Sequence, residues 1–364
     1  MLHGHSRCYF HYKLGILVGL VLYALGVILF IPASLVGLFY PFCAAFFIMT
    51  CGLSFLETSA NPYILSMGDE STATQRLNLA QSFNPMGSII GILVAKDFIL
   101  AKLNKLSTDQ RATLVADEFN KVKMDDLAIV RGPYVAIGLV LLVVFIMIYF
   151  TKMPKSKDSG GSLDISGTFR RLTANIRYRE GVIAQAFYVG AQITVWTYTV
   201  HYGTEVLMQE GMIEANAAAY AVNFNFYAMI LFAVSRFVCT FLLKYISPGR
   251  LLMYLSIAAI LCLMPVIFIG GRFGLYALVG ISGCMSLMFP TIYGIALKGI
   301  GDDAKLGAAG LVMAIAGGSL LPPLQGLLLD SAGVLLSYTM PILCFIVIAW
   351  YGFRVGGLAV SSEQ

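Results

Sequence analysis

Glu57 is an acidic residue placed well inside an apolar segment of the sequence, residues 38–66. A charged carboxylate at the centre of a bilayer costs about 2.5–3.5 kcal/mol even on permissive insertion scales. Such a group should face a cavity or a partner, where it can gain and lose a proton as its surroundings change between wet and dry. The position predicts an acid that couples proton entry to a second cargo. The alternative is a structural acid paired permanently with a cation, for which Arg236 is the obvious candidate.

Amide side chains follow this acid at helical spacing. Asn61 comes four residues after Glu57, so both project from one face of a helix that Pro62 is expected to kink or end. Three further amides recur at every third position of the next predicted helix: Asn78, Gln81 and Asn84. That spacing keeps them within a sector of about 120°. Such amides can bind the hydroxyls of a sugar, or they can serve only as hydrogen bonds between helices.

A similar polar stripe lies in the second half of the chain, in AQAFYVGAQITVWTYTVHY (184–202). Its members share one helical face: Gln185, Tyr188, Gln192 and Trp196. Aromatic rings can stack on the apolar face of a pyranose while amides bind its hydroxyls. The alternative is an aromatic belt at the membrane interface, which fits residues 198–202 better. Asn223 follows on the next predicted helix and is a further candidate ligand.

Arg236 and Pro290 are candidates for a gating or structural role. Arg236 lies eight residues before Lys244, which places it about 12 Å deeper along a helix. The position suits a gate or a salt bridge better than a ligand. Pro290, in FPTIYG (289–294), is expected to kink a helix, which could serve rocking of the helices or simply packing.

Composition excludes a soluble protein. The 364 residues are 59% hydrophobic and only 12% charged, whereas soluble domains carry about a quarter charged residues. The seven cysteines are scattered without paired spacing, so neither a disulfide nor a metal site is predicted. The sequence contains no nucleophile elbow, zinc-protease motif or phosphate-binding loop, which argues against an enzyme. Basic residues cluster in loops and predict no nucleic-acid partner.

The apolar segments predict an all-α integral membrane fold. Crossing the hydrocarbon takes about 20 apolar residues, and ten segments qualify. They are residues 13–32, 38–66, 77–100, 131–150, 181–202, 216–243, 250–269, 273–296, 306–327 and 334–353.

A basic segment divides these ten segments into four and six. We expect a half-bundle of four helices over 1–150, a cytoplasmic linker over 151–180 and a six-helix bundle over 181–364. Lys and Arg gather in alternate loops and in the linker, which places both termini in the cytoplasm. A long basic cytoplasmic loop between two bundles is the organisation of major facilitator transporters, although a ten-helix protein of another design is also compatible.

The stretch LETSANPYILSMGDESTATQRLNLAQSFNPMGSIIG (56–91) closely resembles the L-fucose/proton symporter branch of the major facilitator superfamily. That branch carries an E-T-[SA]-A-N-P run followed by R-L-N-[LF]-A-Q-[ST]-F-N. The resemblance continues through YVGAQITVWTY, FPTIYGIALKGIG and MPILCFIVI, and so covers nearly all of the chain from about Lys13 onward. It implies two halves around a central cavity that alternate between inward and outward openings.

The resemblance also implies roles for individual residues. Glu57 matches the branch's proton-coupling glutamate. Matches to polar residues of the sugar cavity and its motifs are Asn61, Asn78, Gln81, Asn84, Gln192 and Trp196. The implied protein is a monomeric multi-pass symporter of the bacterial plasma membrane that carries a sugar with protons. It needs no cofactor, because the proton gradient drives transport.

The resemblance departs from the branch at the N-terminus. Aligned on the motifs, the chain begins just before the branch's third helix, so ten helices of a usual twelve are expected, without the aspartate that is the branch's second proton-linked acid. L-fucose or a related hexose is the expected substrate. The alternative is a non-transporting truncated fragment or a membrane sugar sensor. Translation of the DNA upstream of Met1 discriminates them: two further apolar segments favour the transporter.

Overall fold

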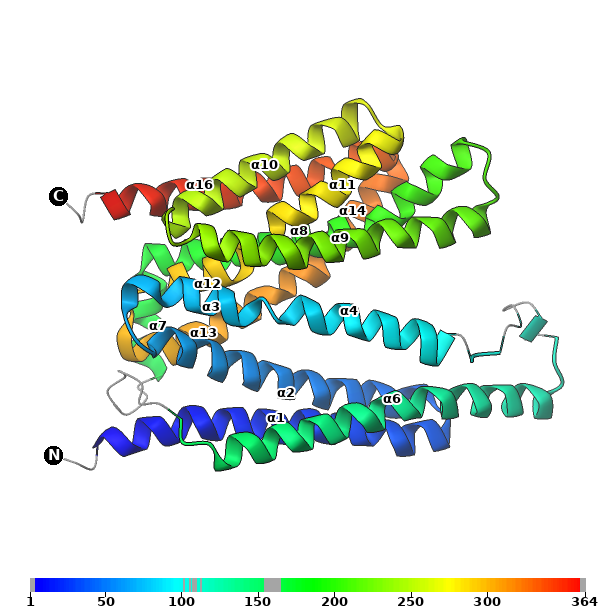
Figure 1. Cartoon of the computed structure of the whole chain (residues 1–364), viewed down its shortest axis with the longest axis horizontal. Helices are drawn as coiled ribbons and strands as arrows, with labels where there is room; N and C mark the ends of the chain where they lie inside the picture. The colour runs from blue at the N-terminus through cyan, green and yellow to red at the C-terminus, as the bar shows by residue number, and fades with distance from the viewer. Residues whose placement is uncertain are drawn as a thin grey trace. The chain divides into compact units, whose positions relative to one another are not determined.

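The computed structural model describes residues 4–100, 102–104, 106, 110–111, 113–153 and 165–360, and every regular element among them is helical. The chain divides into two compact units (Figure 1). One comprises Met1–Tyr63 with Ile90–Gly160, and the other comprises Ile64–Ile89 with Gly161–Gln364. We call them the N-terminal unit and the C-terminal unit. The predicted linker, residues 151–180, falls partly on 154–164, which lie outside the described residues.

The N-terminal unit is built on three long helices: α1 (Gly4–Val36), α2 (Phe39–Ser66) and α6 (Ala116–Phe150). It also holds the end of α4 (Asn84–Val94) and the π-helical turn η2 (Ala95–Leu100). Glycines let α1 and α2 approach closely, because a Cβ at Gly26 would lie 2.5 Å from the backbone nitrogen of Met49. At the end of α6, the Lys13 ammonium donates to the carbonyl oxygens of Tyr149 and Thr151 at 2.8 and 2.9 Å.

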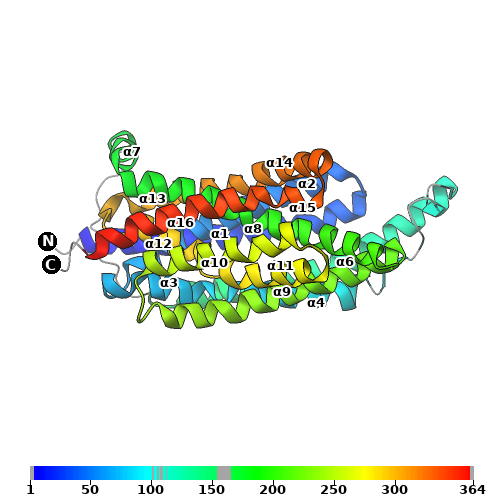
Figure 2. The ribbon, with the colours of Figure 1, turned by 90° about the horizontal axis from the view of Figure 1, so that it is seen from above.

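The C-terminal unit surrounds the 34-residue helix α8 (Ile176–Gln209). Around it pack α9 (Glu214–Leu242), α11 (Gly271–Met285), α12 (Met288–Leu297), α14 (Gly317–Ala332) and α16 (Thr339–Val360) (Figure 2). Fully buried tyrosines of α8, Tyr188 and Tyr202, lie in the resulting apolar core.

Further elements complete this unit. They are η1 (Glu70–Thr72), α3 (Ala73–Gln81), α7 (Ile165–Ala174), α10 (Pro248–Phe268), η3 (Gly301–Asp303), α13 (Ala304–Met313), η4 (Ala314–Ala316) and α15 (Val334–Ser337). Within the unit, the last turn of α16 lies at the same end as α7, and the turn from α8 to α9 lies at the opposite end (Figure 1).

The predicted count of ten spans is not confirmed. Among the described residues, eight helical stretches are long and apolar enough to cross a membrane. They are Tyr12–Val36, Phe39–Ser66, Ala116–Phe150, Asn216–Leu242, Pro248–Phe268, Gly271–Leu297, Gly301–Ala332 and Val334–Gly356. The predicted segments 77–100 and 181–202 have no counterpart there. The first is broken into shorter helices, and the second lies in α8, whose amides and hydroxyls lower its apolar content.

Two predicted helices follow a different course from the one expected. The predicted segment 38–66 is not one of them, because α2 runs from Phe39 to Ser66 with Pro62 inside it. The segment 77–100 breaks after Gln81, between α3 and α4. The segment 273–296 breaks between Met285 and Met288, so Pro290 occupies the third position of α12 rather than a helix interior. A proline is well tolerated there, because the first-turn N–H groups have no partner within the helix.

Candidate functional site

Arg236, on α9, bridges the two helix breaks of the C-terminal unit. Its side chain is 4% exposed. Its Nε donates to the carbonyl oxygen of Ser286 at 2.5 Å, and one terminal nitrogen donates to the carbonyl oxygen of Gln81 at 2.8 Å. These acceptors are the last residue of α3 and the residue after α11. One guanidinium therefore ties α9 to both discontinuities.

Both acceptors are carbonyls that a proline has left without their usual helical donor. In an α-helix the carbonyl of residue i accepts from the N–H of residue i+4. Pro85 is four residues after Gln81, and Pro290 is four residues after Ser286. Proline has no N–H, so neither bond can form. Arg236 supplies both missing donors, which matters because an unpaired buried carbonyl is costly in a membrane interior.

An aromatic contact extends this arrangement from Arg236 toward α8. The Arg236 guanidinium lies over the Phe232 ring, 4.6 Å from its centroid. The Trp196 ring meets Phe232 edge-on, with 5.1 Å between centroids. The indole N–H of Trp196 donates to Ser282 Oγ on α11 at 3.1 Å. Trp196 is thus held at its polar edge and is half-buried, so its remaining accessible surface is apolar.

Asn78 joins α3 to α12. Its side chain is fully buried, and its Nδ2 donates to the carbonyl of Thr74 at 2.9 Å and to Thr291 Oγ1 at 3.1 Å. Its Oδ1 is buried without a hydrogen-bond partner in the part of the chain that the structure describes. The helix-joining role that the sequence left open is therefore present, and only the oxygen is left to bind anything else.

The other candidate amides of this unit differ in accessibility. Gln81 and Gln192 are half-buried, and Asn84 and Asn223 are exposed. The break after Gln81 removes the single helical face on which Asn78, Gln81 and Asn84 were expected together. The first two residues of the α8 stripe are not accessible. Gln185 and Tyr188 are fully buried, and the Tyr188 hydroxyl donates to the Met285 carbonyl at 3.1 Å.

Glu57 and Asn61 lie together on α2, within the N-terminal unit. The Asn61 amide donates to Glu57 Oε2, as their four-residue spacing predicts for side chains on one face. Asn61 is 5% exposed and Glu57 is half-buried. The pair combines a carboxylate that can accept a proton with an amide that supports its charged form.

Sequence reasoning missed several residues that shape this region: Pro85, Ser282, Ser286 and Thr291. A local signal existed for two of them, because a proline inside an apolar segment frees the carbonyl four residues earlier. No local signal identifies which side chain then binds that carbonyl. For metals, no group of three or more His, Cys, Asp or Glu side chains among the described residues could hold an ion.

Long apolar helices, with polar groups gathered where helices are interrupted, are typical of a polytopic membrane transporter. Residues 10–320 match the family model of the Major Facilitator Superfamily. The chain is 47% identical over 357 residues to the L-fucose-proton symporter of Haemophilus influenzae, covering 95% of this chain and 82% of that protein. It is 32% identical to the glucose/galactose transporter of Brucella abortus, covering 94% and 78%.

A solved structure gives the same result. The crystal structure of the Escherichia coli fucose:proton symporter, FucP, matches with a TM-score of 0.87 at 34% identity, covering 94% of this chain and 84% of that one. The chain belongs to the major facilitator superfamily. The resemblance predicted from residues 56–91 is therefore confirmed, and these relatives are transporters, not enzymes.

Proposed function

We propose that this protein is a proton-coupled symporter of L-fucose or a related hexose that works by alternating access. The observation that carries the proposal is the 47% identity, over nearly the whole chain, to a protein named as an L-fucose-proton symporter. The 32% identity to a protein named as a glucose/galactose transporter extends the proposed substrate class from L-fucose to related hexoses. The proposed transport needs no cofactor, since the proton gradient supplies the free energy.

Glu57 is the proposed proton-coupling acid. When ionised, its carboxylate accepts the hydrogen bond from Asn61. When protonated, it loses its charge and the carboxyl group becomes a donor as well as an acceptor. The neutral form is cheaper to enclose in a low-dielectric surrounding than the charged form. Loading a proton therefore favours the conformational change that carries the proton and the sugar across together.

The proposed sugar ligands are six amides and one aromatic ring. The amides are Asn61, Asn78, Gln81, Asn84, Gln192 and Asn223. Asn78 would bind through Oδ1, which has no hydrogen-bond partner among the described residues. Trp196 offers an apolar ring surface whose orientation is fixed by Ser282 and Phe232. Arg236, Pro62 and Pro290 are proposed to act in gating and in the geometry of the helices rather than as ligands. We also propose that the protein is a monomer in the bacterial plasma membrane, with both termini cytoplasmic.

Transport in proteoliposomes tests this function. An inward proton gradient should drive uptake of labelled L-fucose, and a protonophore should abolish the accumulation. Glu57→Gln imitates the protonated acid, so it should lose gradient-driven uptake and keep sugar counterflow, which needs no net proton movement. Competition by D-galactose and D-glucose then ranks the hexoses.

Glu70→Gln is the matched control, because Glu70 is an exposed acid in η1. This variant should transport L-fucose as the unaltered protein does. If Glu57→Gln loses counterflow together with uptake while the protein stays folded, Glu57 is structural rather than proton-coupling. Absence of both activities for every hexose in the unaltered chain would overturn the transporter proposal.

A further inference from the structure

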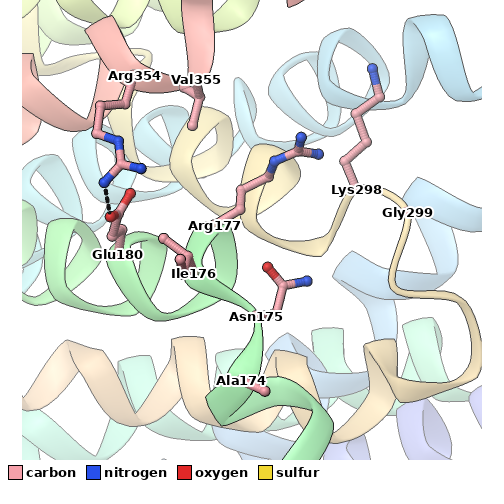
Figure 3. A pocket seen from close by; sticks show the side chains of 9 residues that line it. All are labelled: Ala174, Asn175, Ile176, Arg177, Glu180, Lys298, Gly299, Arg354 and Val355. Atoms are coloured by element: carbon pink, nitrogen blue, oxygen red, sulfur yellow. Dashed lines mark hydrogen bonds and ion pairs between the residues drawn. The ribbon is translucent and has the colours of Figure 1, made fainter. Parts of the chain in front are cut away.

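A cavity of about 520 Å³ lies at one end of the C-terminal unit, and none of the candidate transport residues lines it. It is lined by the start of α8, the turn after α12 and the end of α16 (Figure 3). The charged side chains at its wall are Arg177, Glu180, Lys298 and Arg354. Three cations face one carboxylate, so the cavity carries a surplus of positive charge.

Arg354 already has its partners. Its guanidinium forms an ion pair with Glu180 and lies over the Trp350 ring, 5.3 Å from the centroid. This pair neutralises itself and forms one wall of the cavity. The positive charge that is left over belongs to Arg177 and Lys298.

Arg177 and Lys298 make no side-chain hydrogen bond or ion pair with any described residue, although both line the cavity. Figure 3 shows the Arg177 guanidinium extending toward the α12–η3 turn that carries Lys298, and away from the Arg354–Glu180 pair. The backbone of Arg177 is fixed. The Tyr351 hydroxyl donates to its carbonyl at 3.4 Å, and Asn175 Oδ1 accepts from the neighbouring Tyr178 N–H at 3.2 Å.

We propose that this cavity binds a phosphate ester through Arg177 and Lys298. A guanidinium offers a planar fork of donors and an ammonium offers a compact charge, and the two together suit the oxygens of a phosphate. The first turn of α8 adds the positive end of a helix dipole, which favours an anion. A volume of 520 Å³ is within the range of small-molecule sites and exceeds what a bare phosphate fills.

The phosphate ester can come from a lipid or from solution. The exposed side chains of Ile176, at the cavity, and Phe169, on α7, offer apolar contacts to a phospholipid. A soluble phosphate monoester would use the same two cations without them. The chemistry of recognition is shared, and the two sources are separated by experiment.

The test uses the whole protein purified in a neutral detergent. Native mass spectrometry measures retention of phosphatidylglycerol against phosphatidylcholine, and calorimetry measures binding of glycerol 3-phosphate. The variant R177Q/K298Q should weaken binding of the preferred phosphate ester at least tenfold, with the effect shrinking at high salt. The control is Arg179→Gln, on the same helix but outside the cavity, which should change affinity by less than twofold.

Each outcome decides the proposal. Loss of phosphatidylglycerol alone in R177Q/K298Q supports a lipid headgroup site, and loss of glycerol 3-phosphate supports a site for a soluble ester. If R179Q weakens binding as much as R177Q/K298Q, or if neither probe binds the unaltered protein, the cavity is not a phosphate site. Unchanged thermal unfolding of the variants shows that the comparison is between folded proteins.

Discussion

At the scale of single residues, Arg236 has the most consequential position in the C-terminal unit. It donates to the carbonyls of Gln81 and Ser286, which Pro85 and Pro290 leave without helical donors. Two interrupted helices can persist in an apolar interior because one side chain satisfies both. Trp196 depends on the same neighbourhood, since Phe232 lies between its ring and Arg236.

Replacing Arg236 by lysine tests the two hydrogen bonds of its guanidinium to the carbonyls of Gln81 and Ser286. Lys keeps the charge, but its single ammonium cannot reach both carbonyls in the planar geometry of a guanidinium. A buried acceptor left unpaired costs about 1–3 kcal/mol. We expect a lower unfolding temperature and reduced counterflow. Arg250→Lys, at an exposed position of α10, is the control and should change stability by less than about 0.5 kcal/mol. Equal unfolding temperatures for the two variants would contradict the bridging role.

The two tryptophans of the chain, Trp196 and Trp350, allow a direct test of sugar stacking. In Trp350→Phe, the fluorescence of Trp196 should change when L-fucose is added. In Trp196→Phe, the fluorescence of the remaining Trp350 should stay the same. Trp196→Ala should raise the half-saturation concentration for sugar about tenfold, equivalent to about 1.4 kcal/mol, while Trp196→Phe keeps an aromatic ring and loses less. A sugar response confined to Trp350 would place the binding site elsewhere.

At the scale of elements, the close approach of α3 and α12 fixes the amide-bearing region. Asn78 bonds to Thr291 across the two helices. Gly294, one turn further along α12, leaves room for Thr74 on α3. A Cβ at Gly294 would lie 2.8 Å from Thr74 Oγ1 and 3.1 Å from its Cγ2. The glycine therefore sets the spacing at which Asn78 reaches Thr291.

Gly294→Ala should destabilise the protein by about 1–3 kcal/mol, the usual cost of overpacking. Thr74→Ala removes the two nearest atoms, so G294A/T74A should lose less stability than the two single changes added together. Gly280→Ala is the control within α11. Its Cβ would meet only Cys262 Sγ at 3.9 Å, and an alanine in a helix is favoured over glycine by about 0.5–1 kcal/mol. Thermal unfolding in detergent measures the stability of all four variants. If the stability losses of Gly294→Ala and Thr74→Ala simply add in G294A/T74A, the contact between residues 294 and 74 is not the cause of the loss.

At the scale of the whole molecule, each of the two units can be related to the membrane through its own helices. In the C-terminal unit, α7 and the end of α16 share one end, and the α8–α9 turn lies at the other. The basic residues of the former end and the positive-inside rule predict that this end faces the cytoplasm. The cavity proposed to bind a phosphate ester lies at this end too, and on the predicted cytoplasmic side it would meet both anionic headgroups and soluble phosphate esters.

Reporter fusions test this orientation. If the C-terminus is cytoplasmic, a fluorescent protein fused after Gln364 should fold and emit light. Alkaline phosphatase fused at the same place should be inactive. Alkaline phosphatase inserted in the α8–α9 turn, after Gly211, should be active. An active phosphatase at Gln364 would invert the assignment, and with it the proposed side of the phosphate cavity.

Sequence by itself determined the class of the protein and the contact between Glu57 and Asn61. An acid at Glu57 with Asn61 one turn later is a local pattern, and helical periodicity alone places them together. The apolar segments likewise follow from composition and length. The broken helices were predicted less well, since 77–100 and 273–296 were expected to be continuous. Their prolines were visible, but how a chain accommodates a proline depends on its neighbours.

Only the tertiary structure decided how the polar groups are partnered. Arg236 binds carbonyls 155 and 50 residues away along the chain, and Asn78 binds a hydroxyl 213 residues away. Helical periodicity relates residues only a few positions apart, so it cannot predict partners this far apart in the sequence. Asn78 and Asn84 look alike in the sequence, six residues apart, but Asn78 is buried and Asn84 is exposed. The difference follows from which helix packs against each side chain. The positions of Arg177 and Lys298 follow in the same way, because folding brings no acid of the described residues into an ion pair with either cation.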